Sequence, residues 1–442
     1  MKRIFIRHKT FLLLLGLFCC TSCAKPKESI IVSEVQKKGS IVNIVGEQDN
    51  WTLIVNGTPF YIKGVGCGLV KGKQNEDFLK LAKELGANSL RTWGTDQGTK
   101  EYIDKAAEYG LMVNAGIWLN WASAEEGFSY IGDNEYKRSK WKEAIDYVKE
   151  YKDHPAILMW NVGNEALLFT KSEEEKIALC QFLEKLIQEI HKIDPNHPVI
   201  YAATSYMSFK YIRDYVPSLD IIGSNCYGSI RSIHAAWKHL KFDKPYVITE
   251  FGPFLPMDRP KDVNGKSIEL DDYKKASIYR HLLLQLKSLR KSNIGGFAFH
   301  LGDTTQESMT WWNINQGEFK KQSYWEIFKE YNGILAPYSA PKLKSIDLSK
   351  VDNIERGETI TVEVILDTAL NGNNYNYQYL LSTSVENELK YYVNEYVEIE
   401  VIGHGPKVQV KLPQEKGIYR LYCFVKDDKN NLSSINKSLK IE

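Results

Sequence analysis

The apolar and polar positions follow two different patterns along the chain. From about Trp51, short continuous apolar runs alternate with stretches in which apolar residues recur every three or four positions. The first pattern is typical of strands buried on both faces, and the second is typical of amphipathic helices. Eight apolar runs precede Gly333: residues 60–66, 88–94, 111–119, 156–165, 197–204, 219–227, 245–252 and 294–302.

Helical spacing follows the strands. Residues 75–86 and 99–110 are examples, and the segment after the fourth run begins with the capping-box sequence Ser172-Glu173-Glu174-Glu175. Eight strands, each followed by a helix over roughly 280 residues, predict an α/β fold of the (β/α)8 barrel type. A doubly wound sheet is the alternative, but the glycines at 64–68 do not form the phosphate-binding pattern G-x-G-x-x-G. We expect these glycines to permit close packing.

The pattern changes after the last barrel helix, which we expect to end near Asn332-Gly333. A proline-containing linker covers residues 336–342, and short stretches of alternating polarity follow, separated by turn residues. Such alternation predicts a small immunoglobulin-like β-sandwich. The expected domains are therefore a barrel over 51–336 and a sandwich over 337–442. We expect the sandwich to act as a spacer or a lid, although its tyrosines leave carbohydrate binding open.

The N-terminus has the pattern of a targeting segment. Four basic residues precede the apolar run at 11–18, which is too short to be a good membrane span. Thr21-Ser22 then precede Cys23, as in bacterial lipoprotein signals. We expect a signal peptide over 1–22, a lipid on Cys23 and a tether with an N-terminal strand over 23–50. The protein would then lie in the cell envelope, attached to a membrane; an ordinary secretory signal or a short anchor is the alternative.

Composition narrows the function classes. The 57 basic and 55 acidic residues nearly balance, and no basic stripe indicates nucleic-acid binding. The four cysteines beyond Cys23 are far apart and lack C-x-x-C spacing, so we expect buried free thiols. No cluster of histidines and acids has metal-ligand spacing, and we expect neither a metal nor another cofactor.

Barrel chemistry lies at the carboxyl ends of the strands. The polar and aromatic candidates there are Arg91, Trp93, Trp118, Asn120, Asn164, Glu165, Asn225, Tyr227, Glu250, His300 and Asp303. The dipeptide Asn-Glu occurs five times in the chain, but only Asn164-Glu165 closes an apolar strand. Glu250 also ends an apolar strand, and a carboxylate in such surroundings requires partners or a function. The two glutamates should face each other across the barrel mouth.

Two opposed carboxylates in an aromatic cleft indicate glycoside hydrolysis. We expect Arg91 and Tyr227 to hold Glu250 ionised as the nucleophile, and the opposing charge to raise the pKa of Glu165, the acid/base. Asn164 would hold a sugar hydroxyl. The alternative is that Arg91 and Glu250 form a structural ion pair.

Several other residues are expected to contact the substrate. Trp118, Trp311 and Trp312 are candidate stacking platforms for a sugar ring, and His300 is a candidate polar contact. Trp160 is expected to belong to the core.

Two motifs resemble a known clan. "WNVGNE" at 160–165 and "VITEFG" at 247–252 resemble the acid/base and nucleophile motifs of the retaining glycosidases that include glycoside hydrolase families 2 and 5. The resemblance runs from about Trp51 to Gly333. It implies Glu165 as acid/base, Glu250 as nucleophile, and Arg91, Asn164 and Tyr227 as supporting residues. Many clan members carry Trp at the end of strand eight, where this chain reads "FHLGD", so Trp311 or Trp312 would take its place.

The resemblance also suggests a substrate. A lipoprotein barrel with one immunoglobulin-like module is similar to the family 158 endo-β-1,3-glucanases of gut bacteria. We therefore expect a retaining hydrolase that acts on the β-glucan of an oligo- or polysaccharide by double displacement. The alternatives are a β-glycosidase or mannanase of the same clan, a transglycosylase, or a surface glycan-binding protein without catalysis.

Overall fold

The computed structural model describes residues 39–442 except 48, 303–309, 368–373 and 384–395. The predicted signal peptide, the tether, Cys23 and Asp303 lie outside the described residues. Within the described part, no helix combines the length and the apolar character needed to cross a membrane.

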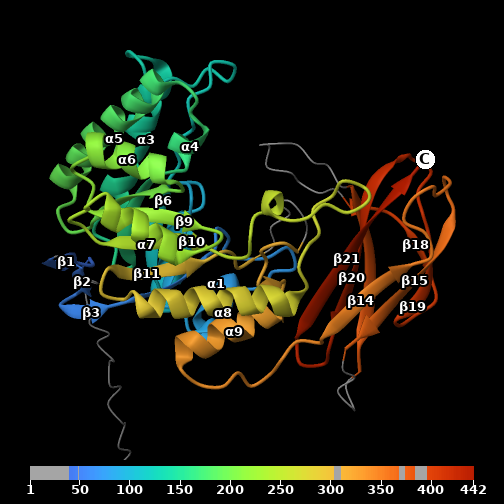
Figure 1. The fold of residues 1–442 in the computed structure, drawn as a ribbon. Coiled ribbons are helices and arrows are strands. Elements are labelled where there is room, and N and C mark those ends of the chain that lie inside the picture. The colour runs from blue at the N-terminus through green and yellow to red at the C-terminus, as the bar shows by residue number, and fades with distance from the viewer. Residues whose placement is uncertain (1–38, 48, 303–309, 368–373, 384–395) are drawn as a thin grey trace, which may run out of the picture. The chain divides into compact units, whose positions relative to one another are not determined.

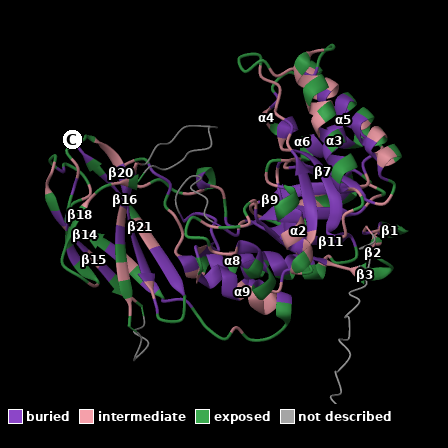
Figure 2. Cartoon of the chain, turned by 180° about the vertical axis from the view of Figure 1, so that it is seen from behind, coloured by how far each residue is buried: buried purple, intermediate pink, exposed green. Residues whose placement is uncertain are grey.

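Eight parallel strands close into a barrel, as predicted (Figure 1). They are β4 (Ile62–Gly66), β5 (Ser89–Arg91), β6 (Met112–Ile117), β7 (Ile157–Asn164), β8 (Val199–Ala203), β9 (Ile221–Cys226), β10 (Tyr246–Phe251) and β11 (Asn293–Ala298). Each strand pairs with its sequence neighbour, and β11 pairs with β4 to close the ring. The strands are buried almost throughout (Figure 2), which explains their continuous apolar runs.

Helices follow every barrel strand. They are α1 (Phe78–Leu85), α2 (Lys100–Glu108), α3 (Glu135–Tyr151), α4 (Ala166–Phe169), α5 (Glu173–Ile193), α6 (Tyr206–Tyr215), α7 (Ile230–His239), α8 (Asp272–Ser288) and α9 (Gln322–Asn332), with a 3-10 turn η1 (Pro256–Asp258) before α8. The last helix ends where the sequence indicated, at Gly333 in the left-handed conformation.

The capping box of α5 forms only in part. The Ser172 side chain accepts a hydrogen bond from the Glu175 amide at 3.4 Å. The Glu175 carboxylate does not complete the predicted reciprocal bond. It accepts instead from Ser129 Oγ at 2.6 Å and from the Tyr130 amide at 2.8 Å. The glutamate therefore fixes the β6–α3 loop rather than its own helix end.

A small antiparallel sheet precedes the barrel: β1 (Val42–Glu47), β2 (Asn50–Val55) and β3 (Thr58–Phe60). Asn56 and Gly57, both with positive φ, make the two-residue turn between β2 and β3. Val42, Leu53 and Val55 share one apolar cluster with residues of the barrel strands, so this sheet packs on the barrel.

Two four-stranded sheets form the C-terminal sandwich. One contains β14 (Leu343–Leu348), β15 (Thr359–Leu366), β19 (Lys407–Lys411) and β18 (Glu400–Ile402); the other contains β17 (Tyr396–Val397), β16 (Asn376–Thr383), β20 (Gly417–Lys426) and β21 (Leu432–Ile441). Two short strands, β12 (Asn315–Gln316) and β13 (Phe319–Lys320), pair before α9. The predicted sandwich is present, and Cys67, Cys180, Cys226 and Cys423 are buried free thiols as expected.

A buried polar network joins β21 to the barrel. Ser434 receives a hydrogen bond from Lys321 Nζ at 2.8 Å and donates its amide to Asp272 at 2.7 Å. Asn436 donates to Glu269 at 2.6 Å, and Thr310 donates to the same carboxylate at 2.7 Å. The sandwich thus bonds to Glu269 in the loop after β10. Through Glu269 it also fixes Thr310, the residue directly before Trp311.

We predict that Lys321→Met destabilises the protein by about 3 kcal/mol, because it leaves the buried Asp272 carboxylate without one of its cations. The neighbouring change Lys320→Met removes a pair with the half-exposed Glu84 and should cost less than about 1 kcal/mol. Urea unfolding of both variants measures the difference. Equal losses would contradict the account of this network.

Candidate active site

Both predicted glutamates lie at irregular strand ends. The pairing of β7 with β8 shifts register between Asn161 and Asn164, and that of β10 with β9 shifts just before Glu250. Such irregularities commonly redirect side chains beside active sites. Glu165 has φ 55° and ψ 6°, a left-handed conformation that costs a non-glycine residue about 1 kcal/mol or more. Its amide donates to the Ala202 carbonyl at 2.9 Å, which holds this conformation.

Arg91 lies at the centre of the site with no exposed surface. One terminal nitrogen, Nη1, donates to Glu250 Oε1 at 2.7 Å and to the Thr249 carbonyl at 2.8 Å. The other, Nη2, donates to Asn164 Oδ1 at 2.7 Å. With its amide oxygen turned towards the guanidinium, Asn161 accepts from Arg91 Nε at 3.2 Å. The guanidinium is therefore fully engaged.

Glu250 accepts hydrogen bonds from three side chains. Besides Arg91, the indole of Trp93 donates to Oε1 at 2.8 Å, and the Tyr227 hydroxyl donates to Oε2. Burial and the Glu250 charge raise the pKa of Tyr227 well above its usual value, so its hydroxyl keeps the proton that it donates. Three donors, one of them cationic, therefore converge on the Glu250 carboxylate.

Glu165 has different surroundings. Burial raises its pKa to about 7, and the negative charge of Glu250 adds to the effect. A hydrogen bond from Asn225 Nδ2 to Oε1, at 2.6 Å, and the more distant Arg91 charge act in the opposite direction. The carboxyl group therefore holds its proton below about pH 7. The predicted contrast between a charge-paired and an unpaired glutamate is present in the geometry.

Asparagine side chains connect the two glutamates. Asn225 Nδ2 donates to Asn164 Oδ1 at 3.1 Å as well as to Glu165, and Asn225 Oδ1 accepts from Thr249 at 2.7 Å. Asn164 Oδ1 thus receives bonds from both Arg91 and Asn225. This fixes the orientation of the Asn164 amide, and its Nδ2 has no partner among the described residues.

Aromatic side chains form one wall beside Glu250. The buried residues Phe299, Trp311 and Trp312 form a cluster, and Trp93, Tyr227 and Leu255 pack against it. Trp311 is only 3% exposed, and its indole donates to the Phe254 carbonyl at 3.0 Å. It therefore supports the wall and offers little free face for a sugar, contrary to the expected platform. Trp312 is also buried, at 7%.

The remaining predicted contacts are less closely tied to the glutamates. His300 packs against Phe299 and Trp93, with ring centroids 5.0 and 5.9 Å apart. Burial lowers the pKa of His300 to about 4, and its Nδ1 has no hydrogen-bond partner among the described residues. Trp118 is half-buried directly after β6. Trp160 belongs to the core, as expected, and donates to Asp194 at 2.7 Å.

Two contacts were not assigned from the sequence. Trp93 and Asn225 stand at strand ends, where the sequence indicated chemistry, but neither received a role. The Trp93 indole donates to Glu250, and the Asn225 amide donates to Glu165. Both donors could have been suggested from their positions at the carboxyl ends of barrel strands.

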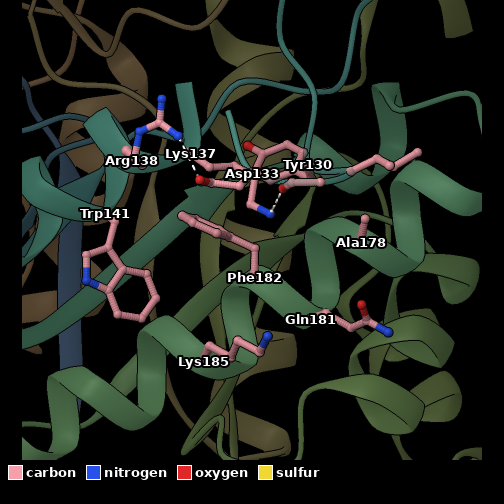
Figure 3. A pocket seen from close by; sticks show the side chains of 11 residues that line it. Tyr130, Asp133, Lys137, Arg138, Trp141, Ala178, Gln181, Phe182 and Lys185 are labelled. Carbon is pink, nitrogen blue, oxygen red and sulfur yellow. Dashed lines mark hydrogen bonds and ion pairs between the residues drawn. The ribbon is translucent and has the colours of Figure 1, made fainter. Parts of the chain in front are cut away.

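A separate cavity of about 620 Å³ lies on the outside of the barrel (Figure 3). Side chains of α3, α5 and the β6–α3 loop line it, including Tyr130, Trp141 and Phe182. Neither glutamate belongs to this lining, so the cavity is distinct from the site described above.

The sequence of the barrel matches a known domain. Residues 47–256 match the model of the glycosyl hydrolases family 2 TIM barrel domain. The barrel is of the family 2 glycoside hydrolase type. The matched residues include Arg91, Glu165, Glu250 and the site asparagines Asn161, Asn164 and Asn225.

Curated relatives of this glycosidase-type barrel are β-glucuronidases. The pig protein is 25% identical over 212 residues, covering 45% of this chain and 29% of its own. The human protein is 23% identical over 339 residues, covering 67% of this chain and 48% of its own. The chain thus spans less than half the length of either relative.

Solved structures share the fold. A β-glucuronidase from Bacteroides uniformis superposes with a TM-score of 0.53 at 13% identity, over 91% of this chain and 48% of that one. A β-galacturonidase from Eisenbergiella tayi gives a TM-score of 0.51 at 18% identity, over 68% of this chain and 55% of that one.

We predict that Glu165→Gln stabilises the protein at alkaline pH. A folded-state pKa raised above the usual value means that this group costs stability progressively as pH rises through about 7. The variant should therefore gain roughly 2–3 kcal/mol at pH 8.5 and much less at pH 4.5, as measured by denaturant unfolding. A gain that does not depend on pH would show that the carboxyl group is not perturbed as described.

Proposed function

We propose that the protein is a retaining β-glycoside hydrolase, with Glu165 as acid/base and Glu250 as nucleophile. The observation that carries the proposal is the contrast between the two glutamates. One shared hydrogen-bond network contains both, yet of the two glutamates Arg91 pairs with Glu250 alone, and burial raises the pKa of Glu165 to about 7. Hydrolysis with retention needs this combination of one ionised and one protonated carboxyl group.

The reaction then proceeds in two displacements. In the first, Glu250 attacks the anomeric carbon while Glu165 gives its proton to the departing glycosidic oxygen. In the second, Glu165 takes a proton from water, which attacks the anomeric carbon and releases Glu250. Asn164 Nδ2, oriented by Arg91 and Asn225, would donate to a sugar hydroxyl beside the reacting carbon.

For the substrate we propose a neutral β-linked sugar, with a β-1,3-glucan as the polysaccharide substrate. The relatives that were compared act, by their names, on uronides, whose carboxylate calls for a cation. Among the described residues, the cation that touches either glutamate is Arg91, and its nitrogens are already engaged. Residues 303–309, which lie between Phe299 and Trp311 in the sequence, contain no lysine or arginine. The relatives' names favour a β-glucuronide as the second candidate.

Kinetics of two variants test the roles. Glu250→Ala should lower turnover at least about 10³-fold on every substrate, because the attacking group is lost. Glu165→Gln should lower the hydrolysis of 4-nitrophenyl β-glucoside about 10²-fold or more, and that of the 2,4-dinitrophenyl analogue much less, because the better leaving group needs no acid. The substitution Glu84→Gln, at an exposed glutamate, serves as the control and should leave turnover unchanged.

The same assay ranks the substrates. Aryl β-glucoside, β-galactoside, β-mannoside and β-glucuronide are compared with β-1,3-, β-1,4- and mixed-linkage glucans. We expect the β-glucoside and the β-1,3-glucan to be cleaved at least 100-fold better than the glucuronide. Preference for the glucuronide would contradict the proposed substrate, and full activity of Glu250→Ala would contradict the proposed mechanism.

We propose in addition that the protein is anchored in the cell envelope by a lipid on Cys23. The support is the sequence pattern of basic residues, apolar run and Thr21-Ser22-Cys23. When the full chain is expressed in a bacterial host, it should partition into the detergent phase of a Triton X-114 extraction. Cys23→Ala should shift it to the aqueous phase. Unchanged partitioning of the variant would contradict lipidation at this residue.

A further inference from the structure

Trp93 contacts the centre of the site without having been assigned a role. Its indole Nε1 donates to Glu250 Oε1 at 2.8 Å, the same oxygen that receives the bond from Arg91. The face of the ring lies 5.2 Å from the guanidinium carbon of Arg91. Trp93 therefore touches both members of the central ion pair, and it remains half-buried while Arg91 is fully enclosed.

Two glycines of neighbouring strands lie against Trp93. A Cβ on Gly66, at the end of β4, would lie 2.8 Å from the indole Cη2. A Cβ on Gly116, on β6, would lie 2.4 Å from the Trp93 carbonyl carbon. Phe299 meets the indole edge-on, with centroids 5.7 Å apart. Gly66 is thus one of the glycines at 64–68 that the sequence marked for close packing.

Three donors divide between the two oxygens of Glu250. Arg91 and Trp93 share Oε1, and Tyr227 bonds Oε2. Two donors on one oxygen fix the rotation of the carboxylate, and hydrogen bonds to the charged form stabilise it. Arg91 also donates to the Thr249 carbonyl and to Asn164, whereas the Trp93 indole donates to Glu250.

We propose that Trp93 is a positioning residue for Glu250, and that it acts chiefly in the second displacement. This inference rests on the proposed function. In that step the bond between the anomeric carbon and Glu250 breaks, and its electron pair returns to the carboxylate. Water supplies the new bond to the anomeric carbon and gives its proton to Glu165. A donor fixed at Oε1 stabilises the negative charge as it returns.

The first displacement responds differently to the same donor. There the carboxylate loses negative charge as it attacks, so a donor that stabilises the free carboxylate gives no comparable acceleration. Loss of the donor disturbs the orientation of Glu250, which slows the attack. It also leaves Oε1 more nucleophilic, which speeds the attack, so the two effects oppose each other. Removal of the indole N–H should therefore slow the second step more than the first.

Trp93→Phe keeps an aromatic ring and removes the N–H. With 2,4-dinitrophenyl β-glucoside we expect kcat to fall about 10-fold or more, because a hydrogen bond to a charged group is lost. The value of kcat/KM should fall less, and a burst of dinitrophenolate equal to the enzyme concentration should precede the slower steady state. The acidic limb of the kcat/KM profile should also move to higher pH.

A matched control removes a similar indole bond elsewhere. Trp237 is buried in α7, and its Nε1 donates to the Lys244 carbonyl at 2.8 Å. Trp237→Phe should behave as the wild type does: its burst amplitude, its KM and the acidic limb of its kcat/KM profile should be unchanged. Gly66→Ala provides a second route, because its Cβ displaces the Trp93 ring without altering any hydrogen-bonding side chain. It should reproduce the direction of each change.

The outcomes separate the two proposals. If the wild type and Trp93→Phe show the same kcat, no burst and the same acidic limb, Trp93 does not position Glu250, whereas the hydrolase assignment stands. If Trp93→Phe lowers kcat and kcat/KM equally, and Trp237→Phe does the same, the role of Trp93 is structural only. Full activity of Glu250→Ala would instead overturn the proposed function, and this inference with it.

Discussion

The site depends on the buried guanidinium of Arg91. A cation without exposed surface is stable only when its charge is neutralised and its N–H groups are bonded, and Glu250, Thr249, Asn164 and Asn161 meet that demand. The position of Arg91 therefore fixes the position of Glu250 and of the Asn164 amide together. Glu165 lies in the same network without a direct bond to the guanidinium, and burial raises the pKa of its carboxyl group to about 7.

The barrel supplies the positions that this electrostatic arrangement requires. Arg91 ends β5, Asn164 ends β7, and Glu250 lies one residue from the end of β10, so three strands meet at one ring of side chains. The left-handed backbone of Glu165 is an unfavourable local conformation held by the bond to β8. The sandwich contributes through β21, which holds Asp272 directly and reaches Thr310, next to Trp311, through Glu269.

Much of the fold could be predicted from the sequence. The eight buried strands have continuous apolar runs, and the two glutamates that close such runs stand out because polar groups there need partners. The ion pair of Arg91 with Glu250 and the bond from Tyr227 followed from strand order around a closed barrel. The sandwich was predicted only as a whole, because short edge strands such as β14, β17 and β18 include exposed residues and carry weak alternation.

Contacts that depend on side-chain direction were harder to predict. Trp93 reaches Glu250 because Gly66 leaves space for its ring, and Trp311 is buried with its indole bonded to the Phe254 carbonyl. Glu175 looked like half of a capping box, yet its side chain bonds to a loop residue 45 positions earlier in the chain. Periodicity records which residues are buried but not which neighbours a long side chain reaches.

The central claim is that Glu250 forms a covalent bond to the sugar while Glu165 moves the proton. Incubation with a 2-deoxy-2-fluoro β-glucosyl fluoride, followed by proteolysis and mass spectrometry, tests this most directly, because the fluorine slows release of the intermediate. We expect one fluoroglucosyl group on the peptide that contains Glu250, and no label on Glu165. A label on Glu165, or turnover of the reagent by an enzyme that lacks the Glu250 carboxylate, would contradict the account.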